Sequence, residues 1–378
     1  MSVGTRETNE LNAQATQKIL MSDNKAFLLI PGARLPVDEA DRIVESLSPE
    51  SRQALEAIGE GAGQAVPQVF DHGCYRRAPH LVWLWKVITR RETLPHEAPW
   101  RWLALGGREQ APELWCLTPN TLKDGRITQT RPPLDDSTFM QLTFAIEPVF
   151  LKAGLRLQIW DCHWFLTRRE DWALTATPAM ALSGLTPDEA LLEGDAALDV
   201  RQMLKEVETI LAAHPINAER RAKGEPTIDG VWISGGGHEE LFFPPTLIRS
   251  VAADDDAVRG WANAAGILIE RLGRDQGHWP DAPHGDIIAV IEDLYAPWLA
   301  KDWDAWGKAL PQVAQKLKQY REDAERFEAN IILTVAFGET GAVTLAPAES
   351  GLMDRLFRRK SQLAPAAWCP DRYQEGAH

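Results

Sequence analysis

The stretch that decides the fold runs from His214 to Gly237 and reads HPINAERRAKGEPTIDGVWISGGG. It predicts the end of a helix, a tight polar connection, and a buried strand that runs into three consecutive glycines. Residues without a Cβ accept sharp bends and let other groups come close. Open α/β sheets bind ligands in loops at the carboxyl ends of central strands, so we expect a binding loop here. The alternative is a turn that requires only positive φ.

The glycines match no nucleotide-binding motif. A phosphate-binding loop needs Lys and Ser or Thr after the last glycine, and a dinucleotide fold needs Gly-x-Gly-x-x-Gly opening a helix. Here two acidic residues, Glu239 and Glu240, follow His238, and Pro244 and Pro245 exclude a helix within the next turn. We therefore expect neither motif to operate.

Polar groups in the connection suit a small anion. If the chain is helical after Pro215, Asn217 and Arg220 lie on one face, and arginine donors beside an amide fit a carboxylate or phosphate. The alternative is structural, with Asn217 holding backbone groups and Arg220 pairing with a neighbouring acid. The candidate ligand-binding residues are His214, Asn217, Arg220, Arg221, Trp232, Gly235, Gly236, Gly237 and His238.

The same stretch resembles the His-Pro-x-Asn-x-x-Arg-x-x-x-Gly…Trp-x-x-Gly-x-Gly signature of archaeal-type cofactor-independent phosphoglycerate mutases. It is closer still to their shortened bacterial relatives, the RpfE-type regulatory proteins. The resemblance covers roughly residues 80 to 360, and its specific part is 214–237. It implies an α/β fold: a shortened alkaline-phosphatase-like core sheet flanked by helices, with an α+β insertion module.

This chain departs from the mutases at the positions that carry their chemistry. Those enzymes place metal-binding Asp and Ser near the N-terminus and an Asp-His pair after a late strand. The N-terminal counterpart is absent here, and the late strand, 331–337, runs into Gly338-Glu339-Thr340. The resemblance therefore implies a non-catalytic binding or regulatory protein that keeps a small-anion pocket, with no catalytic residues, metal or cofactor.

The alternative is a metal-dependent phosphatase or phosphomutase acting on a small phosphorylated acid. Its ligands would come from the loop 278–286, which holds His278, Asp281, His284 and Asp286. Imidazole and carboxylate groups are suitable metal ligands, although their spacing matches no known zinc or calcium pattern.

The bulk composition limits the partners. The 378 residues carry 40 basic and 54 acidic side chains, for a formal charge of −14, which opposes direct binding to nucleic acid on electrostatic grounds. No apolar run approaches the ~20 residues of a spanning helix, so we expect no membrane partner and a cytoplasmic protein. A small anion or a protein is the expected partner. The four scattered cysteines predict neither a disulfide framework nor a zinc site.

Periodicity and turn residues divide the chain into five parts. Asp135 caps a helix whose apolar residues Phe139, Leu142, Ile146 and Phe150 share one stripe, and a long strand is expected over 155–167. Further helices are expected from Pro187, over 198–213, and at about 254–273 and 302–328. The predicted divisions are a disordered tail (1–24), an N-terminal α/β segment (25–99), an α+β module (100–175), an α/β core (176–350) and a C-terminal tail (351–378).

Three further clusters each allow a structural and a functional interpretation. Asp161 and His163 share a face of the expected strand while Cys162 points away, which excludes a Cys–His dyad. Trp298, Trp303 and Trp306 suggest a stacking platform or, more simply, core packing. The run Arg355 to Lys360 favours a solvated helix end.

Overall fold

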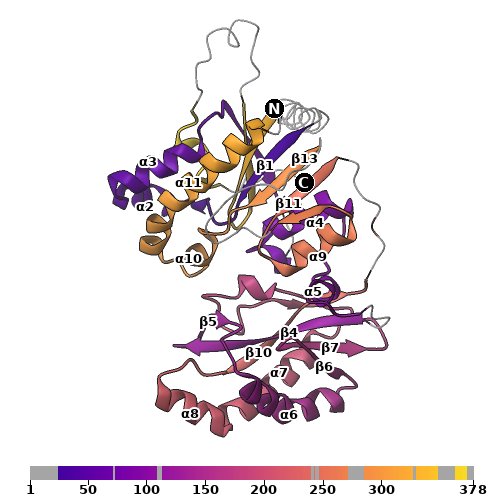
Figure 1. Ribbon diagram of the computed structural model, residues 1–378. Coiled ribbons are helices and arrows are strands. Elements are labelled where there is room, and N and C mark those ends of the chain that lie inside the picture. The colour runs from indigo at the N-terminus through magenta and orange to yellow at the C-terminus, as the bar shows by residue number, and fades with distance from the viewer. Residues whose placement is uncertain are drawn as a thin grey trace, which may run out of the picture.

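The computed structural model describes residues 24–70, 73–108, 113–239, 242, 247–270, 285–326, 329–347 and 362–372. Figure 1 shows two modules, one above the other. None of the helices in these ranges combines the length and apolar character that crossing a lipid bilayer requires.

The larger module is built on a seven-stranded sheet of order β12-β11-β13-β1-β14-β15-β3. The first five strands in this order run parallel, and β15 and β3 add antiparallel pairings at one end. The strands are β1 (Lys25–Ile30), β3 (Gln64–Val69), β11 (Ile248–Ala252), β12 (Leu268–Glu270), β13 (Asp286–Val290), β14 (Ile331–Phe337) and β15 (Gly341–Ala346).

Helices cover both faces of this sheet, which explains why β1 and β13 are buried along their whole length. One face packs against α2 (Ala40–Ser46), α3 (Pro49–Ile58), α10 (Tyr295–Leu299) and α11 (Trp303–Arg326). The other packs against α4 (Pro79–Thr89) and α9 (Asp256–Ala264). The helix α5 (Ala98–Ala104) lies between the modules in Figure 1 and contacts α9 as well as the smaller sheet.

The smaller module is an inserted α+β unit. Its sheet has the order β10-β4-β7-β6, and β5 pairs with β4. Two helices, α6 and α7, cover one face of this sheet. Its elements are β4 (Glu113–Lys123), β5 (Arg126–Thr130), α6 (Asp136–Lys152), β6 (Arg156–Trp160), β7 (His163–Arg168), α7 (Ala197–Ala213), α8 (Pro215–Lys223) and β10 (Gly230–Gly237).

This arrangement confirms the predicted α/β class, with a helix-flanked core sheet and an α+β insertion. Short elements complete it: β2 (Leu35–Pro36), β8 (Thr175–Ala176), β9 (Leu192–Glu193), β16 (Pro370–Asp371), and the 3-10 turns η1 (Gly73–Tyr75), η2 (Ala179–Ala181) and η3 (Pro365–Ala367).

The strand that carries the glycine triplet corrects one expectation. β10 lies at an edge of the smaller sheet, antiparallel to β4, and is not a central strand of the parallel sheet. A short apolar run such as Val231–Ile233 is compatible with a buried strand in either sheet, because burial alone does not specify the neighbours. The ligand-binding rule for parallel sheets therefore does not apply to its end.

Three expected elements differ from the structure. The strand expected over 155–167 is a hairpin, β6 and β7, closed by Asp161 and Cys162 with left-handed φ of 46° and 54°. The helix expected over 254–273 ends at Ala264, and the chain continues into β12. The segment after Pro187 forms turns and no helix. In the hairpin no Pro marks the break and the left-handed residues are not glycines, whereas the end of α9 is marked by Gly266, whose φ is +67°.

The described part of the C-terminal segment packs against the larger module. Trp368 is buried, and Asp371 forms a 2.7 Å ion pair with Arg34 in the loop after β1. Trp298 and Trp306 donate to backbone carbonyls of that same loop, which agrees with the packing interpretation of the tryptophans. Residues 1–23 and the basic run 355–360 lie outside the described residues.

Candidate functional site

The predicted residues of the polar connection lie at the outer end of the smaller module. His214 caps α8, where its Nδ1 accepts from the Ile216 amide at 3.3 Å. Asn217 is fully buried: its Nδ2 donates to the carbonyls of Leu211 and Ile228 at 2.8 and 2.7 Å, and its Oδ1 accepts from the Ile228 amide at 2.8 Å. Its amide group is fully used within the connection.

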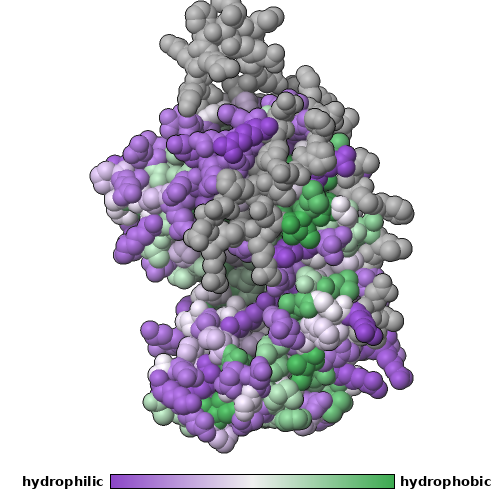
Figure 2. Space-filling model, viewed as in Figure 1, coloured by the Kyte–Doolittle hydropathy of each residue, from purple (hydrophilic) through white to green (hydrophobic). Residues whose placement is uncertain are grey.

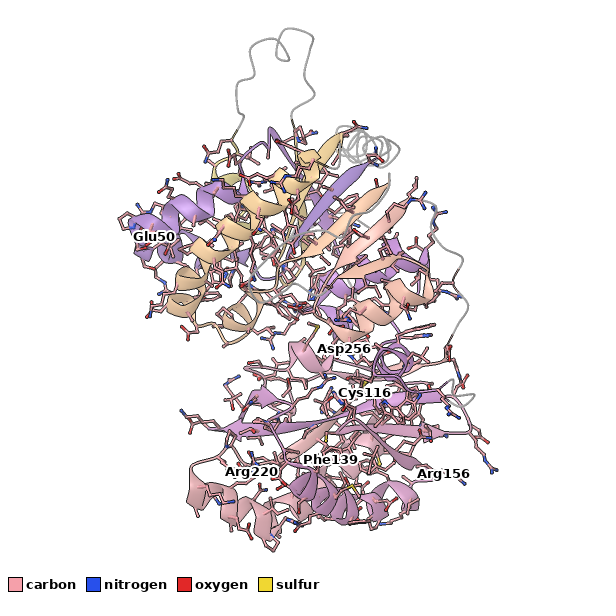
Figure 3. All side chains as sticks on the ribbon, viewed as in Figure 1. Glu50, Cys116, Phe139, Arg156, Arg220 and Asp256 are labelled. Carbon is pink, nitrogen blue, oxygen red and sulfur yellow. The ribbon has the colours of Figure 1, made fainter. Side chains whose placement is uncertain are left out.

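Arg220 is engaged in the same way. Its Nε donates to the Pro226 carbonyl at 2.6 Å, its Nη2 to the Pro133 carbonyl at 3.2 Å, and its Nη1 lies 3.2 Å from Glu225. Arg221 is exposed on α8. Figure 3 shows Arg220 in the smaller module, away from the labelled Cys116 and Asp256. The geometry therefore supports the structural alternative for Asn217 and Arg220.

The glycine triplet packs against the junction. Gly235 has a φ of +65°, and its carbonyl accepts from the Glu97 amide at 2.9 Å. A Cβ on Gly236 would collide with the ring of Trp115. Because these glycines have no Cβ, the segment before α5 can pack against one side of the triplet and the Trp115 ring against the other. Close packing of protein groups therefore explains why glycine occupies these positions.

The remaining predicted residues flank the triplet without forming a pocket with it. Trp232 is buried and its Nε1 donates to the Thr177 carbonyl at 2.8 Å. His238 lies at the surface with Nε2 2.6 Å from a carboxylate oxygen of Asp171. The nine predicted residues are therefore distributed along β10 and at its two ends.

A buried ionic network at the junction contains residues that were not predicted. Arg101 on α5 uses one nitrogen, Nη2, to donate to Glu97 at 3.0 Å and to Asp255 at 2.6 Å. Asp255 also caps α9 by accepting from the amides of Ala257 and Val258. Tyr75 completes the network by donating to the other carboxylate oxygen of Glu97 at 3.2 Å.

The network sets opposite pKa shifts on its two acids. Burial raises the pKa of Glu97 despite the charge of Arg101. Burial also acts to raise the pKa of Asp255, but Arg101 and the amides of the α9 cap outweigh it and lower that pKa below its usual value. A guanidinium therefore occupies the space between two buried carboxylates at the carboxyl end of β11.

Glu292 is a second acid at this edge of the parallel sheet. It follows β13 and is half-buried, and burial, then the charges of Asp255 and Asp254, raise its pKa to about 8. No hydrogen bond engages its carboxyl group among the described residues. The carboxyl ends of neighbouring parallel strands thus bring Asp255 and Glu292 together, as open α/β sheets do with functional groups.

Across the junction, the smaller sheet carries a pocket of about 190 Å³. Its walls come from β4, from the segment after β5 and from the β6–β7 turn with the start of β7: Cys116, Leu117, Thr118, Pro119, Arg131, Pro132, Pro133, Leu134, Cys162, His163, Trp164 and Phe165. No apolar pattern or motif in the sequence marks these positions as a group, because three separate segments supply them.

Arg131 is the distinctive member of this pocket. Its backbone is left-handed, with φ of 53°, and its side chain is exposed. The surrounding protein and the like charge of Arg101 lower its pKa. No acid in the described part of the chain lies within ion-pair distance of its guanidinium. It is therefore a cation whose donors are available to a ligand.

His163 lies in the same pocket. Its Nδ1 is 2.6 Å from the Asp161 carbonyl, so this nitrogen carries the proton and Nε2 is the free position of the ring. Burial and the nearby charge of Arg131 lower its pKa. Cys162 is exposed at the hairpin turn, where its thiol lies 3.3 Å from Asp136. The pocket joins one free guanidinium to one neutral imidazole.

The loop 278–286 is described only at its end. Residues 278–284, including His278, Asp281 and His284, lie outside the described residues. Asp286 is buried at the start of β13, and its Oδ1 accepts from the Lys25 amide at 2.7 Å. Across the described ranges, no group of three or more His, Cys, Asp or Glu side chains is arranged to hold a metal ion.

Comparison with known proteins gives a likeness in structure alone. No family model and no curated protein matches the sequence. The structure is similar to the cofactor-independent phosphoglycerate mutase from Thermoplasma acidophilum DSM 1728, with a TM-score of 0.39, 13% identity, and 87% of this chain and 91% of that chain covered. It is also similar to the PH0037 protein from Pyrococcus horikoshii, with a TM-score of 0.37, 13% identity, and coverages of 86% and 87%. Neither likeness assigns a role to a residue of this chain.

Proposed function

We propose that this chain is a non-catalytic binding or regulatory protein that takes a small anionic ligand in the pocket at Arg131. The observation that carries the proposal is the contrast between the arginines at the junction. Arg101 is committed to two buried carboxylates, whereas Arg131 offers its donors to the pocket without an acidic partner. A guanidinium binds carboxylate and phosphate oxygens with two parallel hydrogen bonds.

The electrostatics of the pocket favour an anion. Arg101 lies close enough to Arg131 to lower its pKa, and Arg131 in turn lowers the pKa of His163. A bound anion offsets both unfavourable interactions and raises the pKa of the imidazole, so an anion of constant charge binds more strongly as the pH falls. The volume of about 190 Å³ suits a small ligand, such as phosphate or a phosphorylated three-carbon acid.

The same junction supports a non-catalytic role. Acids at the carboxyl end of a parallel sheet are suitable for holding a reactive group, but Glu97 and Asp255 are joined through Arg101. Their oxygens also accept from Tyr75 and from the first amides of α9. With these bonds in place, neither carboxylate is available to a substrate or a cation.

Titration calorimetry tests the binding proposal. The ligands are inorganic phosphate and 3-phosphoglycerate, at pH 6 and pH 8. We expect binding by the unaltered chain at both pH values, and a loss of at least tenfold in affinity for Arg131→Ala. Arg126→Ala is the matched control, because Arg126 is an exposed arginine of the same module that pairs with Glu189. Absence of binding by the unaltered chain, or equal affinities in both variants, would contradict the proposal.

Glu292 favours a second candidate, the metal-dependent phosphatase or phosphomutase. A carboxyl group with a pKa of about 8 holds a proton at neutral pH and is suitable as a general acid. This candidate draws its metal ligands from 278–286 and predicts hydrolysis of p-nitrophenyl phosphate that requires Mn²⁺ or Zn²⁺. His284→Ala should abolish that hydrolysis. A purified protein with less than one metal ion per chain and no hydrolysis would exclude it.

A further inference from the structure

The outer edge of the smaller sheet is a bare strand flanked by apolar side chains. β6 pairs with β7 along Arg156–Trp160 and with no other strand of the described residues. The pairing is regular, without a bulge. Proteins usually protect such edges with proline, charge or bulges, since unpaired backbone groups otherwise attract another strand. The edge strand β3 of the larger sheet has Pro67 in its middle, whereas β6 has only Arg156 at one end.

The backbone of β6 presents its free groups in a definite order. A two-residue turn closes the hairpin, so Trp160 and His163 exchange hydrogen bonds across it. Because the pattern alternates, Gln158 also directs its backbone groups toward β7. Leu157 and Ile159 therefore direct their amides and carbonyls outward, away from the sheet.

The flank of α6 on the same side is apolar. Lys152 lies 3.7 Å from Glu206 of α7, which fixes the flank of α6 that faces α7. At 100° per residue, Met140, Phe144 and Leu151 lie within about 40° of one another and roughly 80–120° from Lys152, on the solvent side of α6 that is turned away from α7. Phe144 is 65% exposed and Leu151 is 54% exposed. Figure 2 shows apolar surface on the smaller module.

Ile159 and Trp160 extend this apolar surface onto the strand. Ile159 is on the α6 face, two residues from Leu157, which packs on the α6 core. Trp160 is on the other face, where its Nε1 donates to the Leu105 carbonyl and its ring stays partly exposed. The outward backbone groups of Leu157 and Ile159 thus lie beside apolar side chains of both the strand and the helix.

The residue order of β6 is complementary to itself. If two copies pair antiparallel about Gln158, Leu157 faces Ile159 of the second copy on the α6 side, and Arg156 faces Trp160 on the other side. The first pair is aliphatic, and the second allows a cation–π contact between guanidinium and indole. Leu157 and Ile159 direct their backbone groups outward. Leu157 of each copy therefore exchanges two backbone hydrogen bonds with Ile159 of the other copy.

We infer that this edge is the interface of a two-fold dimer of the chain, in which two β6 strands join the smaller sheets and the α6 flanks pack beside the seam. A two-fold interface uses the same patch on both copies, as this order requires. The inference does not depend on the proposed anion pocket. A register shifted by one residue would place Leu157 and Ile159 opposite residues of the other face and lose the aliphatic pair.

Analytical ultracentrifugation of the full chain at micromolar concentration tests the interface. We expect a dimer, at least a tenfold weaker dimer for Phe144→Asp, and an unchanged dimer for Leu198→Asp. Leu198 is the matched control because it is 78% exposed in the same module, on α7. A monomer in the unaltered chain would overturn the inference, as would equal effects of the two substitutions.

Cross-linking tests the register. In a Cys162→Ser background, which removes the exposed thiol, Gln158→Cys places two thiols at the two-fold axis. We expect an intermolecular disulfide under mild oxidation, and its loss when Phe144→Asp is added. Arg126→Cys, in the same background, is an exposed position on β5 that should remain uncoupled. A dimer that Gln158→Cys fails to cross-link, or coupling of both cysteines alike, would overturn the arrangement.

Discussion

The Arg101 guanidinium and the Asp255 carboxylate form a buried ion pair of 2.6 Å between α5 and the first turn of α9. The same guanidinium nitrogen reaches Glu97, whose amide donates to Gly235 of the smaller module. Arg101 thereby links Glu97, at the start of α5, to Asp255 at the carboxyl edge of the parallel sheet. The relative position of the modules rests on this contact and on the close packing that the glycines permit.

Replacement of Arg101 by Met should destabilise the protein by about 3–5 kcal/mol, because it leaves two buried carboxylates without their cation. Urea unfolding followed by tryptophan fluorescence measures the change in the free energy of unfolding. Lys86→Met is the control, since Lys86 and Glu92 form an exposed pair that contributes about 1 kcal/mol or less. A loss below about 1 kcal/mol in Arg101→Met would show that the network is not required.

Stability should fall as the pH rises toward 8 because of Glu292. Its pKa is about 8 in the folded chain and roughly 4.3 in an unfolded one, so between these values the folded state holds a proton that the unfolded state releases. The stabilisation is complete below the unfolded pKa and is lost as the pH passes through the folded pKa.

Glu292→Gln should remove this dependence. We expect a flatter profile of Tm against pH between 5 and 8, and a higher Tm than the unaltered chain above pH 8. Glu50→Gln, at an exposed position on α3 (Figure 3), should leave the profile unchanged. Parallel profiles for the unaltered chain and Glu292→Gln would refute the assignment.

Asn217→Ala should cost at least about 2 kcal/mol, since it leaves the Leu211 and Ile228 carbonyls and the Ile228 amide without their partner. Arg221→Ala, on the exposed side of α8, should stay within about 0.5 kcal/mol. Chemical denaturation measures both. If Asn217→Ala kept its stability and lost anion binding, Asn217 would be a ligand residue as the sequence predicted.

Cys162→Gly should stabilise the β6–β7 hairpin by about 0.5–1 kcal/mol. Both turn residues have left-handed φ, and glycine at the second position adopts this conformation without the steric cost of a Cβ. Cys162→Ser is the control, because serine keeps the Cβ and should bring no gain. Thermal unfolding compares the three proteins, and equal gains from Gly and Ser would indicate an effect of the thiol instead.

Local signals predicted the elements that local physics determines. The carboxylate of Asp135 accepts from the Thr138 amide at 2.9 Å, so the predicted cap starts α6, and the stripe from Phe139 to Phe150 is buried. Ser48 likewise caps α3. In contrast, Asp161 is the one residue favoured in tight hairpin turns near this break, and Cys162 occupies the position where such a turn favours glycine, so the turn signal in Leu155–Thr167 is weak.

The order of side chains along the chain determined which segments become helices and strands, since capping, periodicity and glycine conformation act over a few residues. It also determined the α/β class, because apolar runs and amphipathic helices bury themselves in few ways. Only the tertiary structure decided which arginine is free. Arg220 and Arg131 are chemically identical, and long-range packing surrounds the first with carbonyls and leaves the second in a pocket. Whether the donors of a side chain are free depends on the acceptors that lie beside it in the folded structure, and the sequence alone does not specify those neighbouring residues.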